Sequence, residues 1–400
     1  MNSILEKFQK ILFLIYPAVL ILNPKLANNF MVFVLLVLVL GNIYINRKII
    51  FTFYEKFMLV FVIAVLISII FKNTTTNSGL VMIERHFRWL ILPTLLGQLE
   101  IKKEDIKCMF LSAFFGILGY TYRFISEMIN LKNAELSWLE FFKSSLLWNH
   151  RYLSEYSIPQ SALILGVTFI ILYYVICIND EKKYKLFLLL GLFLSGIVLM
   201  SVQSRGMTLT LFILILLLGI IRKEKIIKIV SGLIIISSII GGIYFSNSHY
   251  IQRYENLGKD SSSLARVEVY KEAFRLFEKN KINGVGLEGF FESQETENYK
   301  YLEKYGHPHN MALKLLAETG AIGFISYYLF VGSILINLWK KYKENKYFLI
   351  GILALLTLVL YENIETMFIK AIALPYIFFI IGISLNQIYR DKYLEKIKEK

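Results

Sequence analysis

Long runs of apolar residues recur along almost the whole chain, and they restrict its possible folds more than any other feature. Two examples are residues 30–40, FMVFVLLVLVL, and residues 206–221, GMTLTLFILILLLGII. With its flanks, each run supplies roughly the 20 residues that a helix needs to cross a bilayer. Because the hydrocarbon interior offers no water to the backbone, helices satisfy the backbone hydrogen bonds there. With 56% hydrophobic residues and only 18% charged ones, the chain is predicted to be an all-α integral membrane protein, which excludes an ordinary soluble enzyme.

The apolar runs predict about twelve transmembrane helices in a single polytopic membrane domain, residues 1–400. The first run begins like a signal peptide, but no small-residue cleavage site follows it, so we interpret it as the first spanning helix. The helices are expected near residues 9–23, 29–46, 57–71, 82–98, 106–124, 158–178, 185–201, 206–221, 227–245, 316–339, 347–361 and 367–387.

Lysine and arginine gather in alternate connections between these runs, and the formal net charge is +14. Cation-rich connections include KKEDIK (102–107), RKEKIIK (222–228) and KKYKENK (340–346), whereas NTTTNSG (73–79) and ENIET (362–366) hold few cations. Short loops rich in Lys and Arg face the cytoplasm. Both termini are therefore predicted to be cytoplasmic, and the positive charge is interpreted as a topology signal rather than as a nucleic-acid site.

Two connections are long, and both are predicted to be extracytoplasmic: residues 126–157 and residues 246–315. Loops of this length are usually functional or disordered. In the second loop, Ser261–Ser263 can cap an amphipathic helix. Its apolar positions recur at three- and four-residue steps and are expected to face the membrane domain, with Arg266, Lys271 and Arg275 on or beside the polar flank. These apolar positions are Leu264, Val267, Tyr270, Phe274 and Phe277.

The same loop contains GVGLEG (284–289), which matches the dinucleotide-binding pattern G-x-G-x-x-G. That function needs a preceding strand and a βαβ unit, whereas an amphipathic helix is predicted here. Gly284 and Gly286 are instead predicted to form a structural turn, either a plain loop turn or one that lets the backbone approach a ligand or a neighbouring helix.

All five histidines fall at the outer end of a helix or in an outer loop: His86, His150, His249, His307 and His309. Histidine is the side chain best suited to proton transfer near neutral pH, so this placement suggests chemistry outside the cytoplasm. We interpret His86, His150 and His249 as interfacial or structural. The pair His307 and His309 could bind a metal, but no further ligands occur at the usual spacing. Neither a metal nor a cofactor is predicted.

Three arginines lie close to the predicted membrane. Arg205 occupies a tight outer turn between two apolar helices, and Arg85 and Arg88 lie at or within the outer end of another. Charges at such depths are costly and often mark a substrate path. The planar guanidinium suits phosphate recognition because it can donate two hydrogen bonds at once. The alternative is that these side chains extend to lipid headgroups.

The segment GHPHNMALKLLAETG (306–320) combines the two histidines with a predicted helix. Asn310 is expected to cap residues 311–318, and Gly320 to end that helix. His309 then precedes a helix N-terminus, where unpaired amides and the helix dipole favour anions. A neutral imidazole there can accept a proton from a hydroxyl. The pattern predicts His309 as a general base beside a diphosphate, with His307 as a supporting neighbour.

Three motifs resemble the O-antigen ligase and polymerase superfamily. HPHNMALKLLAETGAIGF (307–324) is similar to its H-N…L…E-x-G…G signature, and SRG (204–206) matches its SRG at the start of a membrane helix. Residues 265–290 resemble its R…W…A…G-x-G…F loop, with Tyr270 where tryptophan is frequent.

The resemblance implies a metal-independent glycosyltransferase of the GT-C type in the bacterial inner (cytoplasmic) membrane, with its active site facing the periplasm. The donor would be a glycan on undecaprenyl diphosphate, and the acceptor the lipid A-core of lipopolysaccharide or another glycan. Arg205 and Arg266 would bind the diphosphate, and His309 would be the base for an inverting attack. Asn310, His307, Arg85 and Arg88 complete the expected substrate-binding set. The alternatives are a repeat-unit polymerase with the same chemistry and, less favoured because no repeat is seen, a transporter or glycolipid flippase.

Overall fold

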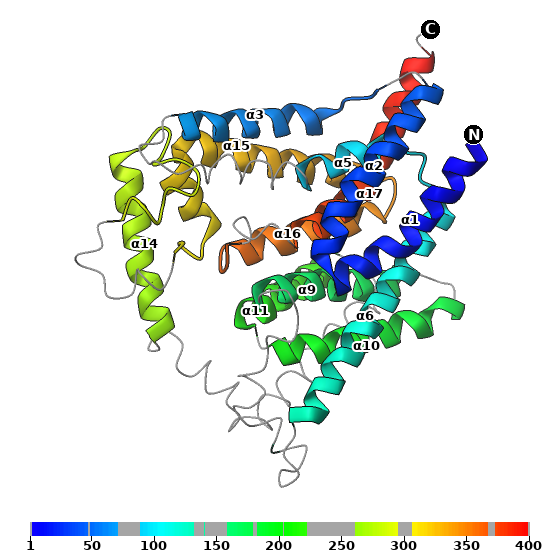
Figure 1. Cartoon of the computed structure of the whole chain (residues 1–400), viewed down its shortest axis with the longest axis horizontal. Coiled ribbons are helices and arrows are strands. Elements are labelled where there is room, and N and C mark those ends of the chain that lie inside the picture. Colours follow the sequence, from blue (N-terminus) through cyan, green and yellow to red (C-terminus); the bar gives the residue numbers. More distant parts are fainter. Residues whose placement is uncertain are drawn as a thin grey trace. The chain divides into compact units, whose positions relative to one another are not determined.

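The computed structural model of the protein describes residues 2–46, 49–70, 89–131, 140, 158–178, 182–202, 204–221, 261–294, 306–366 and 373–398. Within these ranges every regular element is a helix, which confirms the predicted all-helical class. The helices shown in Figure 1 are α1 (Asn2–Leu22), α2 (Pro24–Asn46), α3 (Phe53–Ile70), α5 (Leu92–Gly97), α6 (Lys103–Leu131), α9 (Ile158–Ile178), α10 (Lys182–Val202), α11 (Arg205–Ile221), α14 (Ser261–Lys279), α15 (Met311–Tyr342), α16 (Phe348–Glu362) and α17 (Leu374–Lys398).

Three of these helices contain a segment long and apolar enough to cross a membrane: Phe53–Ile70, Pro159–Ile178 and Met311–Tyr342. Shorter apolar helical segments are Phe33–Tyr44, Lys185–Leu199, Arg205–Ile221 and Phe348–Glu362. Large apolar side chains such as Phe33 and Ile70 are exposed, which suits contact with lipid. The lengths and composition support a multi-pass membrane protein.

Most predicted spans coincide with an observed helix, with ends that differ by several residues. The predicted helix 227–245 lies outside the described residues, as do residues 82–88 of the predicted helix 82–98; the described remainder, 89–98, contains the six-residue α5. Of the two predicted outer loops, 126–157 is described only as far as the end of α6 and at residue 140. The loop 246–315 contains α14, as predicted, and the first turn of α15. The orientation of the chain in the membrane remains a prediction.

The chain divides into two compact units. Unit 1 comprises Met1–Asn29, Lys102–Leu257 and Leu356–Tyr361, and unit 2 comprises Phe30–Ile101, Gly258–Leu355 and Glu362–Lys400. In unit 1, α1 packs along α6, and α10 packs against α6 and α9. The α1–α6 contact includes a hydrogen bond from the Ala18 backbone N–H to the Ser112 hydroxyl, at 2.9 Å.

In unit 2, α15 is the central helix because both α3 and α14 pack against it (Figure 1). Aromatic rings hold α3 to α15: Phe61 lies edge-on to Tyr327 and stacks with Phe330, at centroid distances of 5.4 and 6.2 Å. Such ring pairs add to the burial of apolar area. The central helix is thereby fixed on the face that α3 covers, and its N-terminal end carries the candidate site.

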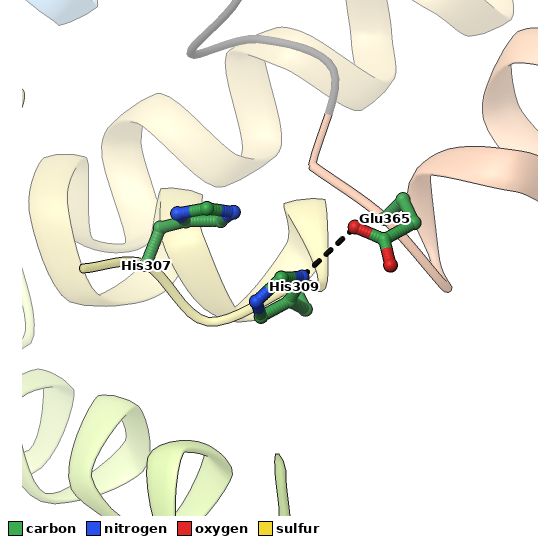
Figure 2. A group of neighbouring side chains, drawn as sticks. All are labelled: His307, His309 and Glu365. Atoms are coloured by element: carbon green, nitrogen blue, oxygen red, sulfur yellow. Dashed lines mark hydrogen bonds and ion pairs between the residues drawn. The ribbon is translucent and has the colours of Figure 1, made fainter. Parts of the chain in front are cut away.

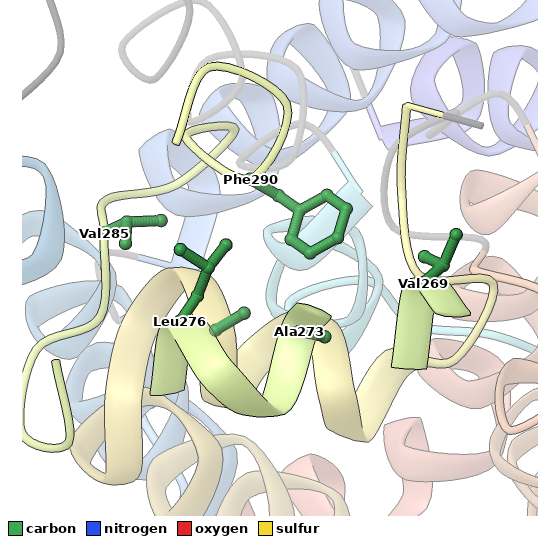
Figure 3. Packing of buried hydrophobic residues seen from close by; sticks show 6 residues of the cluster. Val269, Ala273, Leu276, Val285 and Phe290 are labelled. Carbon is green, nitrogen blue, oxygen red and sulfur yellow. The ribbon is translucent and has the colours of Figure 1, made fainter. Parts of the chain in front are cut away.

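The packed face of α14 differs from the predicted one. Leu264, Val267 and Phe274, which were expected to face the protein, are about half exposed. The buried apolar residues of α14 are Ala265, Val269, Ala273 and Leu276, and the last three of these form a cluster with Val285, Phe290 and Ala317 (Figure 3). Small side chains let α14 approach α15 and the following loop closely, so the bulkier apolar residues remain on the outer side.

Candidate functional site

Three side chains that lie far apart in the sequence meet in unit 2. His309 Nδ1 lies 2.8 Å from Glu365 Oε2, and Arg266 Nη2 donates a hydrogen bond to Glu365 Oε1 at 2.6 Å. Arg266 comes from α14, His309 from the segment before α15, and Glu365 from the turn after α16; Figure 2 shows the contact between His309 and Glu365. One carboxylate therefore joins the predicted phosphate-binding arginine to the predicted base. We call Arg266, Glu365 and His309 the triad.

The backbone of His309, whose side chain contacts Glu365, has a strained conformation. His309 has φ = 52°, in the left-handed region that residues with a Cβ rarely adopt. Pro308 restricts the preceding residue to extended conformations, and the rings of His307 and His309 lie close together, with centroids 4.3 Å apart. A non-glycine residue in this region costs of the order of 1–3 kcal/mol and persists only where its surroundings fix it.

Asn310 makes hydrogen bonds to both segments that form the contact between His309 and Glu365. Its side-chain oxygen accepts a hydrogen bond from the Leu313 backbone N–H at 3.0 Å, which confirms Asn310 as the N-cap of α15. Its side-chain amide donates to the Asn363 carbonyl at 3.0 Å. Tyr327 of α15 adds a hydrogen bond to the Glu362 carboxylate at 2.6 Å. The turn that carries Glu365 is therefore tied to the helix that His309 precedes.

Residues 284–289, which we call the glycine loop, pack against α15, in agreement with the predicted alternative of a turn that approaches a neighbouring helix. The Val285 and Gly286 amides donate to the carbonyls of Ala317 and Glu318, at 2.9 and 2.8 Å. Gly284 has φ = +66°, and a Cβ there would lie 2.3 Å from the Glu318 carbonyl carbon. The loop thus supplies hydrogen-bond donors to carbonyls in the last turn before the break at Gly320.

Gly320 breaks α15, as the sequence predicted, but the helix resumes immediately. Its φ of 63° and ψ of −165° are non-helical, and a Cβ there would lie 2.3 Å from the Ile282 carbonyl oxygen. The helix continues to Tyr342 because the Ala321 and Ile322 amides, left without helical partners by the break, donate to the carbonyls of Lys281 and Ile282.

A buried ionic group connects the glycine loop to α15. The Lys314 ammonium lies 2.8 Å from Glu288 Oε1 and 2.7 Å from Glu318 Oε1, and the Glu288 backbone N–H donates to Glu318 Oε2 at 2.9 Å. Lys314 and Glu318 are each 1% exposed. Removing one member of such a group typically costs about 3–5 kcal/mol, because a buried charge loses its partner. This group holds the loop against the helix that follows His309.

Tyr270 lies one turn after Arg266 on α14, where the related motif has tryptophan. Burial raises the pKa of its hydroxyl, while the charge of Arg266 lowers this pKa and that of Glu365 raises it. The ring therefore belongs to the surroundings of the triad.

Arg266, His307, His309 and Asn310 lie together, as the sequence predicted. Arg205 belongs to unit 1, where it begins α11. Ser204 precedes it and caps this helix, because its hydroxyl accepts the Met207 N–H at 3.4 Å. Arg85 and Arg88 lie outside the described residues, together with His86, His150 and His249.

Glu365 was missed by the sequence reasoning, as were the partners Lys314, Glu288 and Glu318. The available signal for Glu365 was two glutamates in the short connection ENIET (362–366), which was considered only for its lack of cations. Glu365 also supplies the third potential metal ligand that the sequence did not show. Ligand atoms of His307, His309 and Glu365 all lie within 4.8 Å of one another.

The arrangement can move a proton next to an anion. The carboxylate of Glu365 can orient the imidazole of His309, as an acidic partner does for a catalytic histidine. The Nε of Arg266 is buried and makes no hydrogen bond within the described part of the chain. A buried donor without a partner costs about 1–3 kcal/mol, so an anionic ligand that accepts from it would be stabilised. The site thus combines a base with a cationic hydrogen-bond donor.

Comparison with known proteins assigns a family to part of the chain. A search of curated proteins found no match. The family model described as O-antigen ligase matches residues 190–328 of the chain. The matched segment contains Arg205, Arg266, His307, His309 and Asn310 and ends before Glu365. We therefore identify residues 190–328 as a domain of the O-antigen ligase family.

Proposed function

We propose that the protein is a metal-independent glycosyltransferase that transfers a glycan from undecaprenyl diphosphate to an acceptor such as the lipopolysaccharide core. The reaction takes place at the periplasmic face of the inner membrane. The observation that carries the proposal is the triad, in which Glu365 joins Arg266 to His309 within a chain that contains an O-antigen ligase domain.

In the proposed mechanism His309 is the general base. When Nδ1 donates its proton to Glu365, Nε2 is the basic nitrogen and accepts the proton of the acceptor hydroxyl. The hydroxyl oxygen then attacks the anomeric carbon, and the bond from that carbon to the diphosphate oxygen breaks. The electron pair leaves with the diphosphate. Because the hydroxyl oxygen attacks the face opposite the departing diphosphate, the configuration at the anomeric carbon inverts.

The arginines stabilise the leaving group in this mechanism. Arg266 donates a hydrogen bond to Glu365 through Nη2, and its buried Nε can donate another to a phosphate oxygen. We assign Arg205 the role of a second diphosphate ligand on the sequence resemblance of its SRG motif alone; it begins α11, where the helix dipole favours an anion. Removal of one such contact from a developing anion typically costs a factor of about 10²–10³ in rate.

Alanine variants of His309, Arg266 and Arg205 test the mechanism. Each is purified from membranes and assayed for transfer from lipid-linked donor, with and without chelator. We expect each variant to lose at least about 100-fold in rate, and chelator not to lower the rate of the wild type. Lys271→Ala is the matched control for Arg266→Ala, because Lys271 is a cation on the exposed side of the same helix. Full activity in the three variants would refute the mechanism.

A repeat-unit polymerase is the alternative that the same site supports. It would use a second lipid-linked glycan as the acceptor, with the same base and the same leaving group. Incubation with donor alone separates the two activities. A polymerase lengthens the glycan under these conditions, whereas a ligase produces transfer only when the core acceptor is added.

A further inference from the structure

The side chains of His307, His309 and Glu365 form a compact set of potential metal ligands. Each offers one nitrogen or oxygen, and these three atoms lie within 4.8 Å of one another. His309 Nδ1 and Glu365 Oε2 are 2.8 Å apart, and the two imidazole rings are separated by 4.3 Å between centroids (Figure 2). Side chains at such distances need to move by only about 1 Å to surround an ion with bonds of about 2.0–2.2 Å.

Backbone geometry and hydrogen bonds fix the position of this set. Pro308 and the left-handed conformation of His309 direct the two histidines to one side of the segment before α15. The hydrogen bond from Asn310 to the Asn363 carbonyl keeps the turn with Glu365 next to them. A site of this kind loses little conformational entropy when a metal binds, because its ligands come from two segments that are already joined.

The chemistry of the ligands selects the class of ion. Two imidazole nitrogens and one carboxylate oxygen suit Zn²⁺ and related divalent transition metals, whereas Mg²⁺ and Ca²⁺ prefer oxygen ligands alone. Three protein ligands leave a fourth position for water. Arg266 occupies Oε1 of Glu365 and leaves Oε2 on the histidine side. The carboxylate can therefore bind an ion through Oε2 and retain its contact with the arginine.

We propose that His307, His309 and Glu365 bind one Zn²⁺-type ion and that the bound ion inhibits the enzyme. Inhibition rests on the proposed function, because an ion that binds His309 and Glu365 displaces the proton between them and removes the carboxylate that orients the base. Binding of the ion does not depend on that function. The same side chains then serve either as a base with its orienting carboxylate or as a metal site.

Metal binding is measured directly on the full-length protein in detergent. After treatment with chelator and removal of the chelator, the protein is titrated with Zn²⁺ alone, and bound metal is quantified by mass spectrometry. We expect one equivalent per chain in the wild type, and loss of that equivalent in His307→Ala, His309→Ala and Glu365→Gln. His249→Ala controls for adventitious binding to a histidine elsewhere in the chain. Equal zinc content in the wild type and His307→Ala would overturn the proposal.

Two measurements on the wild type keep the test independent of the folding of variants. X-ray absorption at the zinc edge is expected to show two imidazole ligands, and a spectrum without them contradicts the site. Transfer activity is expected to fall on addition of Zn²⁺, to return with chelator and to be unaffected by Mg²⁺. Activity that requires Zn²⁺ contradicts inhibition. Failure of the site leaves the base mechanism intact, whereas a fully active His309→Ala refutes that mechanism without affecting the zinc content of the wild type.

Discussion

The carboxylate of Glu365 contacts both Arg266 and His309, so its charge has two effects at once. It orients the imidazole of His309, and it holds the guanidinium of Arg266 beside that imidazole. Substitution Glu365→Gln keeps the size of the side chain and removes the charge. Because the amide cannot stabilise a protonated imidazole in the same way, we expect kcat for glycan transfer to fall by about 10²–10⁴-fold, the range that general base catalysis contributes.

The matched control for this residue is Glu344→Gln. Glu344 is exposed and forms an ion pair with Lys341 at 2.9 Å, so loss of its charge is expected to change transfer very little. Initial rates measured over a range of donor concentrations separate kcat from KM. A variant Glu365→Gln with the wild-type kcat would show that the carboxylate does not assist the base, even if KM rises.

At the level of elements, substitution of two glycines of α15 by alanine is expected to change the stability of the protein in opposite directions. Gly320 lies in a backbone region that is essentially restricted to glycine, and a Cβ would meet the Ile282 carbonyl oxygen at 2.3 Å. Gly320→Ala is expected to destabilise the protein by at least about 1–3 kcal/mol from backbone strain alone. Gly332 lies in the same helix, and a Cβ added there would have no described neighbour within 4 Å.

Gly332→Ala is therefore the control, and it is expected to stabilise the helix by roughly 0.5–1 kcal/mol. Thermal unfolding of the purified proteins in one detergent gives the two shifts in Tm, which should have opposite signs. If Gly320→Ala unfolds at the wild-type temperature, the loop 281–286 does not pack against α15 in the way described.

Features that depend on residues close together in the sequence could be predicted from it, whereas features that depend on contacts between distant residues could not. Asn310 and Gly320 were predicted because a helix cap and a helix break depend on neighbouring residues. Glu365 was missed because its contact with His309 spans 56 positions of sequence. The buried face of α14 was predicted wrongly because hydrophobicity marked the larger side chains, whereas close packing selected Ala265 and Ala273. Both the contact of Glu365 and the buried face of α14 depend on tertiary packing, which the local sequence pattern does not show.

At the scale of the whole molecule, the orientation in the membrane decides whether the site can act on a periplasmic substrate. Beyond Gly320, α15 continues to Tyr342, which at about 1.5 Å per residue is long enough to cross a hydrocarbon core about 30 Å thick. Lys340 and Lys341 lie in its last turn. Since short loops rich in lysine face the cytoplasm, the triad, near the opposite end of this helix, is predicted to face the periplasm.

Single cysteines test this orientation after Cys108 and Cys177 are replaced by serine. Glu292→Cys introduces an exposed thiol in the long loop with the glycine motif, and Glu344→Cys introduces one in the lysine-rich connection after α15. In intact spheroplasts, a membrane-impermeant maleimide is expected to label the first variant and not the second, and permeabilisation should make both reactive. Labelling of Glu344→Cys alone in intact spheroplasts would place the triad in the cytoplasm, where a periplasmic acceptor cannot reach His309, and would rule out the proposed reaction.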